Sequence, residues 1–486
     1  MREELPESWS SVPLADVVDF NPGIDKSKFR DDDEVPFVPM PAVEAETGRI
    51  DTSARRPFGE VKSGFTAFAS GDVLFAKITP CMENGKMAVA PVLPHGIGFG
   101  TTEFHVLRPT EAVTAAWVYY FVSSAALRHE AQHQMTGAVG QKRVPKRYLE
   151  TKAFPLPPLN EQRRIVEKIE TLFARLDQGE AALRHTQTLL ARYRQSVLKA
   201  AVTGALTADW RAENAHRLEH GRDLFARILQ TRRETWQGRG KYKEPTAPDT
   251  TGLPELPEGW VWATVDMIGE VITGGTPPTS KKEVFYGGPI PFLKPTDLDQ
   301  GDQIIFAREY LTQNGVEKSR TVKRDAVLVT SIGATTGKAG ISRFEKAAFN
   351  QQINAISPYG QVALGDYLYW AVIEGGFQAR IWQNAAATTL PIINKSKFSR
   401  LAIALPSLDE QRIIIDRITR RVSECNALQR WCQTELIRSA ALRQSILKDA
   451  FAGKLVPQDP SDEPAAELLA RIRASRPAPV RKKARA

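Results

Sequence analysis

The stretch LPPLNEQRRI at residues 156–165 recurs as LPSLDEQRII at residues 405–414, an offset of 249 residues. Further along, QSVLKAAVTGAL at 195–206 recurs as QSILKDAFAGKL at 444–455 with the same offset. The segment between these two stretches has therefore kept its length in both copies. Because self-similarity at a fixed period is the sequence signature of a repeated architecture, the sequence predicts one structural unit that is built twice.

Both copies of the repeated segment predict a long helix. From Ile165 the residues of one face follow each other at spacings of 4, 3, 4 and 3 up to Val197, which is the heptad seam of a coiled coil. We expect Asn160 and Asp409 to cap the helices, and Gly204 and Gly453 to end them in the left-handed conformation. The predicted helices span 160–203 and 409–452, and each is about 65 Å long at about 1.5 Å per residue.

Two such stripes in one chain most simply bury each other, so we predict that the helices pack as an antiparallel coiled coil. The alternative is a long helix that packs on its own globular domain. Cys425 and Cys432 lie seven residues apart on the second seam and are expected to fill its core. The predicted core residues of the coiled coil are Ile165, Ile169, Leu172, Leu176, Leu183, Leu190, Ile414, Ile418, Cys425, Leu428, Leu442 and Ile446.

The segments that precede the two helices differ from them in amino-acid composition. They are rich in Pro, Gly and aromatic residues, with short apolar runs such as DVLFAKI from Asp72 and DAVLVTSI from Asp325 that predict buried strands. Each also holds an amphipathic helical stretch, around 117–129 and around 367–382. Weaker echoes occur in the same order in both halves, among them LPESW from Leu5 and LPEGW from Leu256.

The predicted fold class is α+β, with two similar domains separated by the two long helices in a pseudo-twofold internal repeat. The first domain is predicted at 1–155 and the second at 253–404. A central region at 156–252 contains the first long helix, a shorter helix and a Pro/Gly/Lys-rich linker. A C-terminal region at 405–486 contains the second long helix and a basic tail from Arg476, which we expect to be disordered.

Composition narrows the class of protein. The chain has 486 residues, 42% of them hydrophobic, and a formal net charge of +9 that favours a polyanionic partner such as nucleic acid. The N-terminus lacks the apolar core of a signal peptide and no stretch reaches about 20 apolar residues, so we expect a soluble, cytoplasmic protein. Three cysteines without a CxxC pair support neither a disulfide framework nor a zinc site.

The stretches that resemble catalytic or cofactor-binding motifs are all incomplete. GATTGKA from Gly333 fails the phosphate-loop pattern, and GIGFG from Gly96 lacks the third glycine of a dinucleotide fingerprint. Cys81 with His95 or His105 has no second copy in the other half, and FNPG from Phe20 falls short of an amine-methylating motif. We therefore expect a non-catalytic binding scaffold, the alternative being an enzyme whose site follows no known pattern.

Two further stretches are typical of one family. They are KYKEPTAPDTTGLPELPEGWVWATV from Lys241 and ITGGTPPTSKKEVFYGGPIPFLKPTDL from Ile272. With the two repeated helix ends, they make the chain resemble the specificity subunit of type I restriction-modification enzymes across essentially its whole length. The first domain departs more and keeps only VPFVPM from Val35 and DVLFAKI from Asp72 of the usual pattern.

The resemblance implies a subunit that reads a bipartite, asymmetric DNA target. Each domain would read one half-site in double-stranded DNA, and the paired helices would set the gap between them. Two methyltransferase subunits would bring S-adenosylmethionine and methylate an adenine in each half-site, and restriction subunits with ATP- and Mg²⁺-dependent translocase and nuclease activity would join them. The chain itself would bind no cofactor or metal and hold no catalytic residue. The rival interpretation is a coiled-coil adaptor with non-specific DNA affinity.

Base discrimination needs donors and acceptors that reach base edges in the major groove, typically Arg or Lys at guanine and Asn or Gln at adenine. Polar and basic stretches in both domains could supply them. The candidates in the first domain are Lys77, Thr79, Asn84, Lys86, Gln141, Lys142, Arg143, Lys146 and Arg147. The candidates in the second domain are Lys294, Ser331, Thr335, Thr336, Lys338, Asn350, Gln351, Gln352, Asn394, Lys395 and Lys397.

Overall fold

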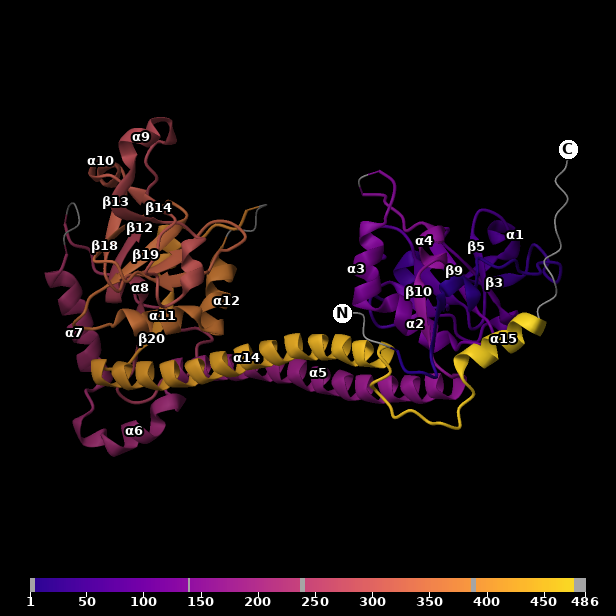
Figure 1. Cartoon of the computed structure of the whole chain (residues 1–486). Helices are drawn as coiled ribbons and strands as arrows, with labels where there is room; N and C mark the ends of the chain where they lie inside the picture. The colour runs from indigo at the N-terminus through magenta and orange to yellow at the C-terminus, as the bar shows by residue number, and fades with distance from the viewer. Residues whose placement is uncertain (1–4, 139, 237–240, 386–389, 476–486) are drawn as a thin grey trace. The chain divides into compact units, whose positions relative to one another are not determined.

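The structure, a computed structural model, describes residues 5–138, 140–236, 241–385 and 390–475. They fall into two compact units, one of residues 1–183 with 434–486 and the other of residues 184–433. Each unit holds one mixed α+β domain together with part of both long helices (Figure 1). We call the α+β domain of the first unit domain 1 and that of the second unit domain 2. The predicted basic tail lies outside the described residues.

Domain 1 is built on two four-stranded sheets and one two-stranded sheet. The first sheet has the order β2 (Val18–Phe20), β9 (Phe104–Pro109), β6 (Val73–Ala76) and β7 (Met87–Val89). The second has the order β4 (Arg55–Pro57), β3 (Glu34–Val38), β8 (Ile97–Gly100) and β5 (Thr66–Ala69), in which only β3 and β8 run parallel. β1 (Ser10–Pro13) pairs antiparallel with β10 (Ala153–Leu156), which leads into the long helix.

Domain 2 repeats this topology strand for strand. Its first sheet is β12 (Gly269–Thr273), β19 (Ile353–Pro358), β16 (Val327–Thr330) and β17 (Ala339–Ile341). Its second is β14 (Glu309–Leu311), β13 (Tyr286–Leu293), β18 (Lys346–Phe349) and β15 (Arg320–Lys323), again with one parallel pair in the middle. β11 (Val261–Thr264) pairs with β20 (Ala402–Leu405). The duplication inferred from the two repeated stretches is therefore present in the fold of both domains.

Each amphipathic stretch predicted as one helix is two helices. Domain 1 has α2 (Ala115–Ser123), α3 (Ala125–His133) and α4 (Lys146–Glu150), and domain 2 has α11 (Gly365–Ile373), α12 (Gly375–Asn384) and α13 (Lys395–Ser399). The break falls at Ser124 and Glu374, which adopt extended backbone angles and whose side chains accept hydrogen bonds from the first turn of the next helix. A local capping group thus ends one helix and starts another. The shorter helices are α1 (Phe58–Val61), α8 (Val265–Ile268), α9 (Lys282–Phe285) and α10 (Gln313–Glu317).

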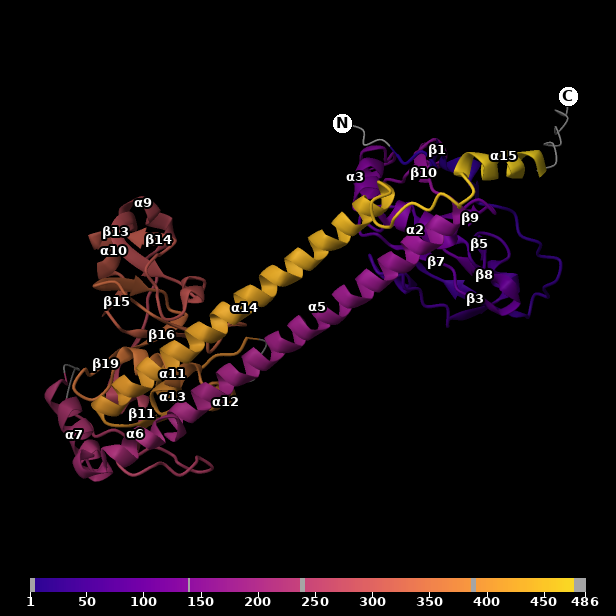
Figure 2. The ribbon, with the colours of Figure 1, turned by 60° about the horizontal axis from the view of Figure 1, so that its bottom comes forward.

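The two long helices are α5 (Leu159–Val202) and α14 (Leu408–Phe451), 44 residues each, one residue earlier than predicted at both ends. In both views they run side by side in opposite directions (Figures 1 and 2). Asn160 and Asp409 lie inside the first turn instead of capping it, and each accepts a hydrogen bond from the arginine three residues later. Gly204 and Gly453 follow the helices with φ of 77° and 69°, as predicted.

The first turn of each long helix is anchored in its domain by the Glu-Gln pair of the repeated motif. Glu161 accepts a hydrogen bond from the Trp9 indole at 3.0 Å, and Glu410 accepts one from the Trp260 indole at 2.8 Å. Burial raises the pKa of Glu161, and the hydrogen bonds from Trp9 and Gln458 oppose this shift.

The glutamine of the pair ties the helix to the chain before α2 or α11. The amide oxygen of Gln411 accepts from Leu364 N–H at 2.9 Å, and its nitrogen donates to the carbonyls of Val362 and Pro406. Gln162 repeats all three bonds in domain 1. The Glu-Gln motif therefore attaches each domain to the first turn of its long helix.

The other end of each helix meets the entry to a domain. A Cβ added to Gly204 would lie 2.5 Å from Pro257 of LPEGW, and one added to Gly453 would lie 2.4 Å from Pro6 of LPESW. Each unit therefore joins the start of one long helix and the end of the other to one domain. The hydrophobic cores agree, since Ile165, Ile169, Ile446 and Leu447 pack in the core of domain 1.

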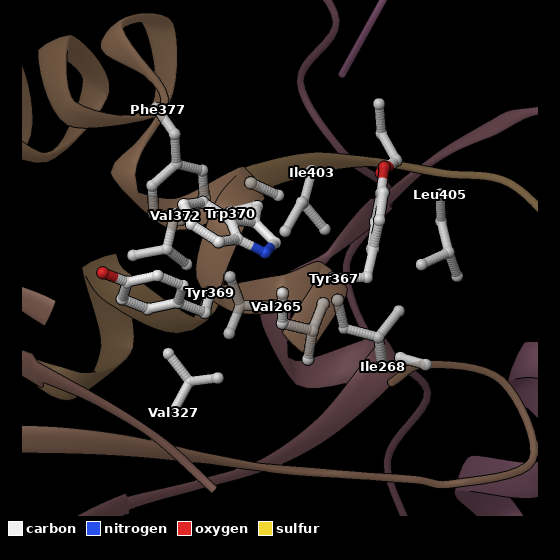
Figure 3. Packing of buried hydrophobic residues seen from close by; sticks show 14 of the residues in the cluster. Val265, Ile268, Val327, Tyr367, Tyr369, Trp370, Val372, Phe377, Ile403 and Leu405 are labelled. Atoms are coloured by element: carbon white, nitrogen blue, oxygen red, sulfur yellow. The ribbon is translucent and has the colours of Figure 1, made fainter. Parts of the chain in front are cut away.

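In domain 2 the same role is taken by Val197, Leu198, Ile414 and Ile418. Figure 3 shows the centre of this core, where Tyr367 and Trp370 of α11 lie among side chains from β16, α8 and β20. The Tyr367 hydroxyl donates to Ala404 O at 2.7 Å, and burial raises its pKa well above the usual value.

The structure corrects the predicted seam of the coiled coil. Leu428 and Leu442, predicted as core, are 50% and 47% exposed, whereas Cys425, Cys432 and Ile446 are buried. Of the other predicted core residues, Ile165, Ile169, Ile414 and Ile418 are buried, and Leu172, Leu176, Leu183 and Leu190 are half-buried.

On α5 the buried stripe departs from the predicted spacing at alternate positions. Glu180, Gln187 and Arg194 are partly buried, whereas Gly179, Thr186 and Tyr193, which continue the predicted spacing of 4 and 3, are exposed. One of these polar seam residues, Glu180, has partners on the facing helix. Glu180 accepts from the Ser439 hydroxyl at 2.7 Å, and Arg443 pairs with Asp177 and Glu180. These pairs fix the rotation that apolar spacing alone leaves open.

Further helices follow each long helix, and α7 and α15 among them pack on the adjoining domain. α6 (Ala208–Glu213) and α7 (Gly221–Glu234) follow α5, and α15 (Ala465–Ser475) follows α14. Leu224 and Ile228 join the core of domain 2, and Leu468 and Leu469 join that of domain 1. None of the described helices is long and apolar enough to cross a membrane.

Candidate nucleic-acid interface

Three chain segments far apart in sequence meet at one place in domain 1. We call them loop A (77–86), loop B (101–103) and loop C (136–147, described without residue 139). Lys77 N–H donates to Glu103 O at 2.9 Å, and Val144 N–H donates to Lys77 O at 2.9 Å. Thr79 N–H donates to Lys142 O at 3.0 Å, so loop A lies between the other two.

Domain 2 builds the same assembly from loop A (331–338), loop B (350–352) and loop C (390–397). Ser331 N–H donates to Gln352 O at 2.7 Å, and Ile393 N–H donates to Ser331 O at 2.9 Å. A β-bridge links Ile332 to Ile392, as one links Ile78 to Arg143 in domain 1. The backbone frame of the loops is therefore shared, while their side chains differ. Because of this shared frame, most predicted contact residues of each domain come together.

The exposed candidates are suited to meet a ligand. In domain 1 they are Asn84, Gln141, Lys142, Lys146 and Arg147, and in domain 2 they are Thr335, Gln351, Asn394, Lys395 and Lys397. Among the residues that the structure describes, Lys142, Arg147 and Lys395 form no side-chain ion pair, so their full charge is available to an anion. Lys146 forms an ion pair with Glu150, and its Nζ lies 3.0 Å from the Glu150 carboxylate.

Other candidates hold the loops themselves. Lys86 Nζ donates to the carbonyls of Met40 and Val43 at 3.1 and 2.9 Å, and Lys338 pairs with Asp299. Thr79 donates to Glu83 at 2.7 Å, and Lys294 pairs with Glu309. These four side chains, of Lys86, Lys338, Thr79 and Lys294, therefore already have hydrogen-bond or ion-pair partners within the protein.

The polar residues of loops A and B in domain 2 behave in the same way. The hydroxyls of Ser331 and Thr336 donate to the carbonyls of Gln352 and Gly333, at 3.0 and 2.7 Å. Asn350 is buried, and its amide donates to Gln352 Oε1 at 3.0 Å. Gln351 is the exposed member of loop B, where its side-chain oxygen accepts a hydrogen bond from Thr276.

An ion pair stiffens the assembly in domain 1. Arg143 makes a two-pronged pair with Glu103, with nitrogen–oxygen distances of 2.9 and 2.8 Å. The hydrogen bonds from Arg143 hold the pKa of Glu103 below its ordinary value. Arg143 therefore bridges loops B and C, and it presents less free charge than the sequence suggests.

Loop B of domain 1 was missed at the sequence level. Thr101, Thr102 and Glu103 precede β9 as Asn350, Gln351 and Gln352 precede β19, and both strands have six residues that end in Pro. The repeat could have located these residues, because FHVLRP and INAISP mark the same position in the two domains. Thr102, like Gln351, is exposed.

The alternative of a hidden catalytic centre gains no support from the loops. Cys81 is half-buried, and burial raises the pKa of its thiol, which disfavours the nucleophilic thiolate. In the part of the chain that the structure describes, no group of three or more His, Cys, Asp or Glu residues is arranged to hold a metal ion.

Comparison with known proteins matches the two halves to one family. The family model described as the type I restriction modification DNA specificity domain matches residues 6–183 and 257–436. The EcoAI type I restriction enzyme specificity subunit of Escherichia coli is 31% identical over 316 residues, 56% of this chain and 52% of the relative. That match spans about half of the relative's length. The StySPI specificity subunit of Salmonella potsdam is 25% identical over an alignment of 508 residues, covering 98% and 97% of the two chains.

Solved structures show the same fold. The HsdS subunit from Thermoanaerobacter tengcongensis aligns with a TM-score of 0.57 and 21% identity, over 93% of this chain and 99% of that one. A chain from a structure of a type I R-M system aligns with a TM-score of 0.65 and 22% identity over the same shares. With one fold, one loop frame and one family model found in both halves, the chain belongs to the type I restriction-modification DNA specificity family.

Proposed function

We propose that this chain is the DNA-reading subunit of a type I restriction-modification complex. In this proposal the loops of domain 1 read one half of a bipartite target and those of domain 2 read the other. The observation that carries it is the loop frame, which is built twice with the same backbone bonds and different side chains. A frame of this kind keeps the protein in one orientation on DNA while its side chains choose the bases.

The two sets of side chains favour an asymmetric target. Loop A begins with Lys77 in domain 1 and with Ser331 in domain 2, and the exposed residue of loop B is Thr102 in one and Gln351 in the other. Glutamine suits an adenine edge in the major groove, whereas a threonine methyl or hydroxyl suits other bases. The two half-sites should therefore differ in sequence. The exposed cations of loop C are suited to phosphates.

Partner subunits carry the chemistry in this proposal. Methyltransferase subunits bring S-adenosylmethionine and methylate an adenine in each half-site, and restriction subunits use ATP and Mg²⁺. The chain itself holds no catalytic residue and binds no cofactor. Support comes from the names of the relatives, which are specificity subunits of type I restriction enzymes.

Selection from a pool of random duplexes with the full-length chain tests the proposal. We expect enrichment of one motif with two different half-sites and a fixed gap. Exchange of residues 1–155 for the matching domain of a relative should then change one half-site and leave the other. Binding without any enriched sequence would point to an adaptor with non-specific DNA affinity and would contradict the proposal, as would a change in both half-sites.

A further inference from the structure

A buried polar side chain lies under loop C in each domain. His105, the second residue of β9, is 7% exposed, and its Nε2 lies 3.0 Å from Val144 O. Asn354, the second residue of β19, is 1% exposed, and its Nδ2 donates to Ile393 O at 3.5 Å. Val144 and Ile393 are equivalent, since each donates its N–H to the first residue of its own loop A. Two different side chains thus make the same contact.

The contact defines the state of the histidine. A carbonyl oxygen only accepts, so Nε2 of His105 must carry a proton to make this contact. Nδ1 is buried without a hydrogen-bond partner among the described residues. The ring stacks on Phe75 at a centroid distance of 6.4 Å. A neutral imidazole fits this place, because a second N–H would be buried with nothing to receive it.

We propose that His105 and Asn354 are positioning residues that hold loop C of each domain against its sheet in the geometry that reads DNA. The inference rests on the proposed function and adds to it two residues that touch no DNA themselves. Loop C carries Lys142 and Arg147 in domain 1 and Lys395 in domain 2, three exposed cations with no ion pair to any residue that the structure describes. A donor beneath the loop backbone fixes where those side chains emerge.

We call the contact of His105 with Val144 O the latch of domain 1, and that of Asn354 with Ile393 O the latch of domain 2. The two latches differ in one respect, because only the latch of domain 1 contains a titratable side chain. Burial lowers the pKa of His105 below its ordinary value of 6.5, and the charges of Lys77 and Lys146 lower it further. The bond to Val144 O and the charge of Glu150 oppose the shift, and the Glu103 carboxylate also interacts with the ring. A lowered pKa in the folded state means that the latch is fully effective above pH 6.5 and loses stability as the pH falls below it. The amide of Asn354 is insensitive to this change.

Hydrogen exchange of the full-length chain tests the latch without DNA. His105→Ala should speed amide exchange in loop C of domain 1 about tenfold, the loss expected for one buried hydrogen bond, and leave loop C of domain 2 unchanged. Asn354→Ala should do the reverse. His105→Gln, which can place an amide N–H near the position of Nε2, should restore protection. Equal exchange in wild type and His105→Ala, or faster exchange in both domains alike, would overturn the proposal.

A pH series covers the case in which His105→Ala does not fold. After correction for intrinsic rates, wild-type protection should fall between pH 7.5 and 5.5 in loop C of domain 1 but not in loop C of domain 2. Parallel loss in both loops, or in neither, would overturn the latch.

Selection from random duplexes then tests the link to reading. His105→Ala should relax the half-site that domain 1 reads, and His105→Gln should restore it. An intact half-site in His105→Ala would overturn the link. If wild type itself enriches no bipartite motif, the proposed function fails, while the exchange data still decide whether His105 holds the loop.

Discussion

At the scale of single residues, the loops separate side chains that hold the frame from side chains that face outward. Lys86 belongs to the first group, because its ammonium is held by the carbonyls of Met40 and Val43. We expect Lys86→Met to lower the stability of the full chain by about 1–3 kcal/mol, since two partly buried carbonyls lose their donor. Thermal unfolding measures the effect. Asn84→Ala, two residues away and exposed, should change it by less than about 0.5 kcal/mol. Similar losses in both variants would contradict this assignment.

Lys146 belongs to the outward group, and its expected effect is on DNA. Lys146→Ala should weaken binding to all duplexes alike and reduce the slope of log K against log salt by about one, because one phosphate contact is lost. Lys62→Ala is a matched control, since both lysine side chains are 44% exposed and each pairs with one carboxylate. Titration at several salt concentrations measures the slope. A loss confined to one DNA sequence would assign Lys146 to base reading.

Gln351 is the corresponding test of base discrimination. It is exposed in loop B of domain 2, where Thr276 is the one described residue that bonds its side chain. We expect Gln351→Ala to lower the preference for one base in one half-site by roughly 1–3 kcal/mol and to leave non-specific binding unchanged. Gln313→Ala, exposed in α10 outside the loops, is the control. Equal losses on cognate and scrambled duplexes would be inconsistent with a reading role.

At the scale of elements, the ends of the long helices depend on glycine and their middles do not. Gly204 has φ of 77°, and an added Cβ would lie 2.5 Å from Pro257. Gly204→Ala should therefore destabilise the chain by at least about 1–2 kcal/mol, the usual cost of the left-handed region for a residue with a Cβ. Gly179→Ala in the middle of α5 has open space around it and should stabilise the chain by about 0.5–1 kcal/mol. Shifts of the same sign in thermal unfolding would refute this distinction.

At the scale of the whole molecule, the proposed function makes the length of the paired helices a functional quantity. The seams impose a condition, because an insertion in one helix alone would break the pairing of Glu180 with Ser439 and Arg443. We therefore predict the effect of seven residues added in register to both helices, after Leu183 in α5 and after Glu435 in α14. One heptad adds about 10 Å. Selected or methylated motifs should keep both half-sites and gain about three base pairs of gap, at about 3.4 Å per base pair.

Two controls make this insertion decisive. Seven residues in α5 alone should lower stability, because the facing seam residues no longer match. Seven Gly and Ser residues after Ala247, an exposed position outside the helices, should leave the gap unchanged. An unchanged gap with both helices lengthened and both half-sites intact would show that the helices do not set the spacing.

The sequence by itself determined the duplication, the α+β class and the two long helices to within one residue. The duplication is visible because two stretches recur at one offset, and the helices and strands follow from local signals, such as heptad spacing, short apolar runs and the glycines after the helices. Only the tertiary structure decided which face of each helix forms the seam, that loop B joins loops A and C, and that Lys86 and Arg143 serve the frame. These outcomes depend on partners tens to hundreds of residues away, such as Met40 for Lys86 and Ser439 for Glu180, and no local pattern encodes such pairs.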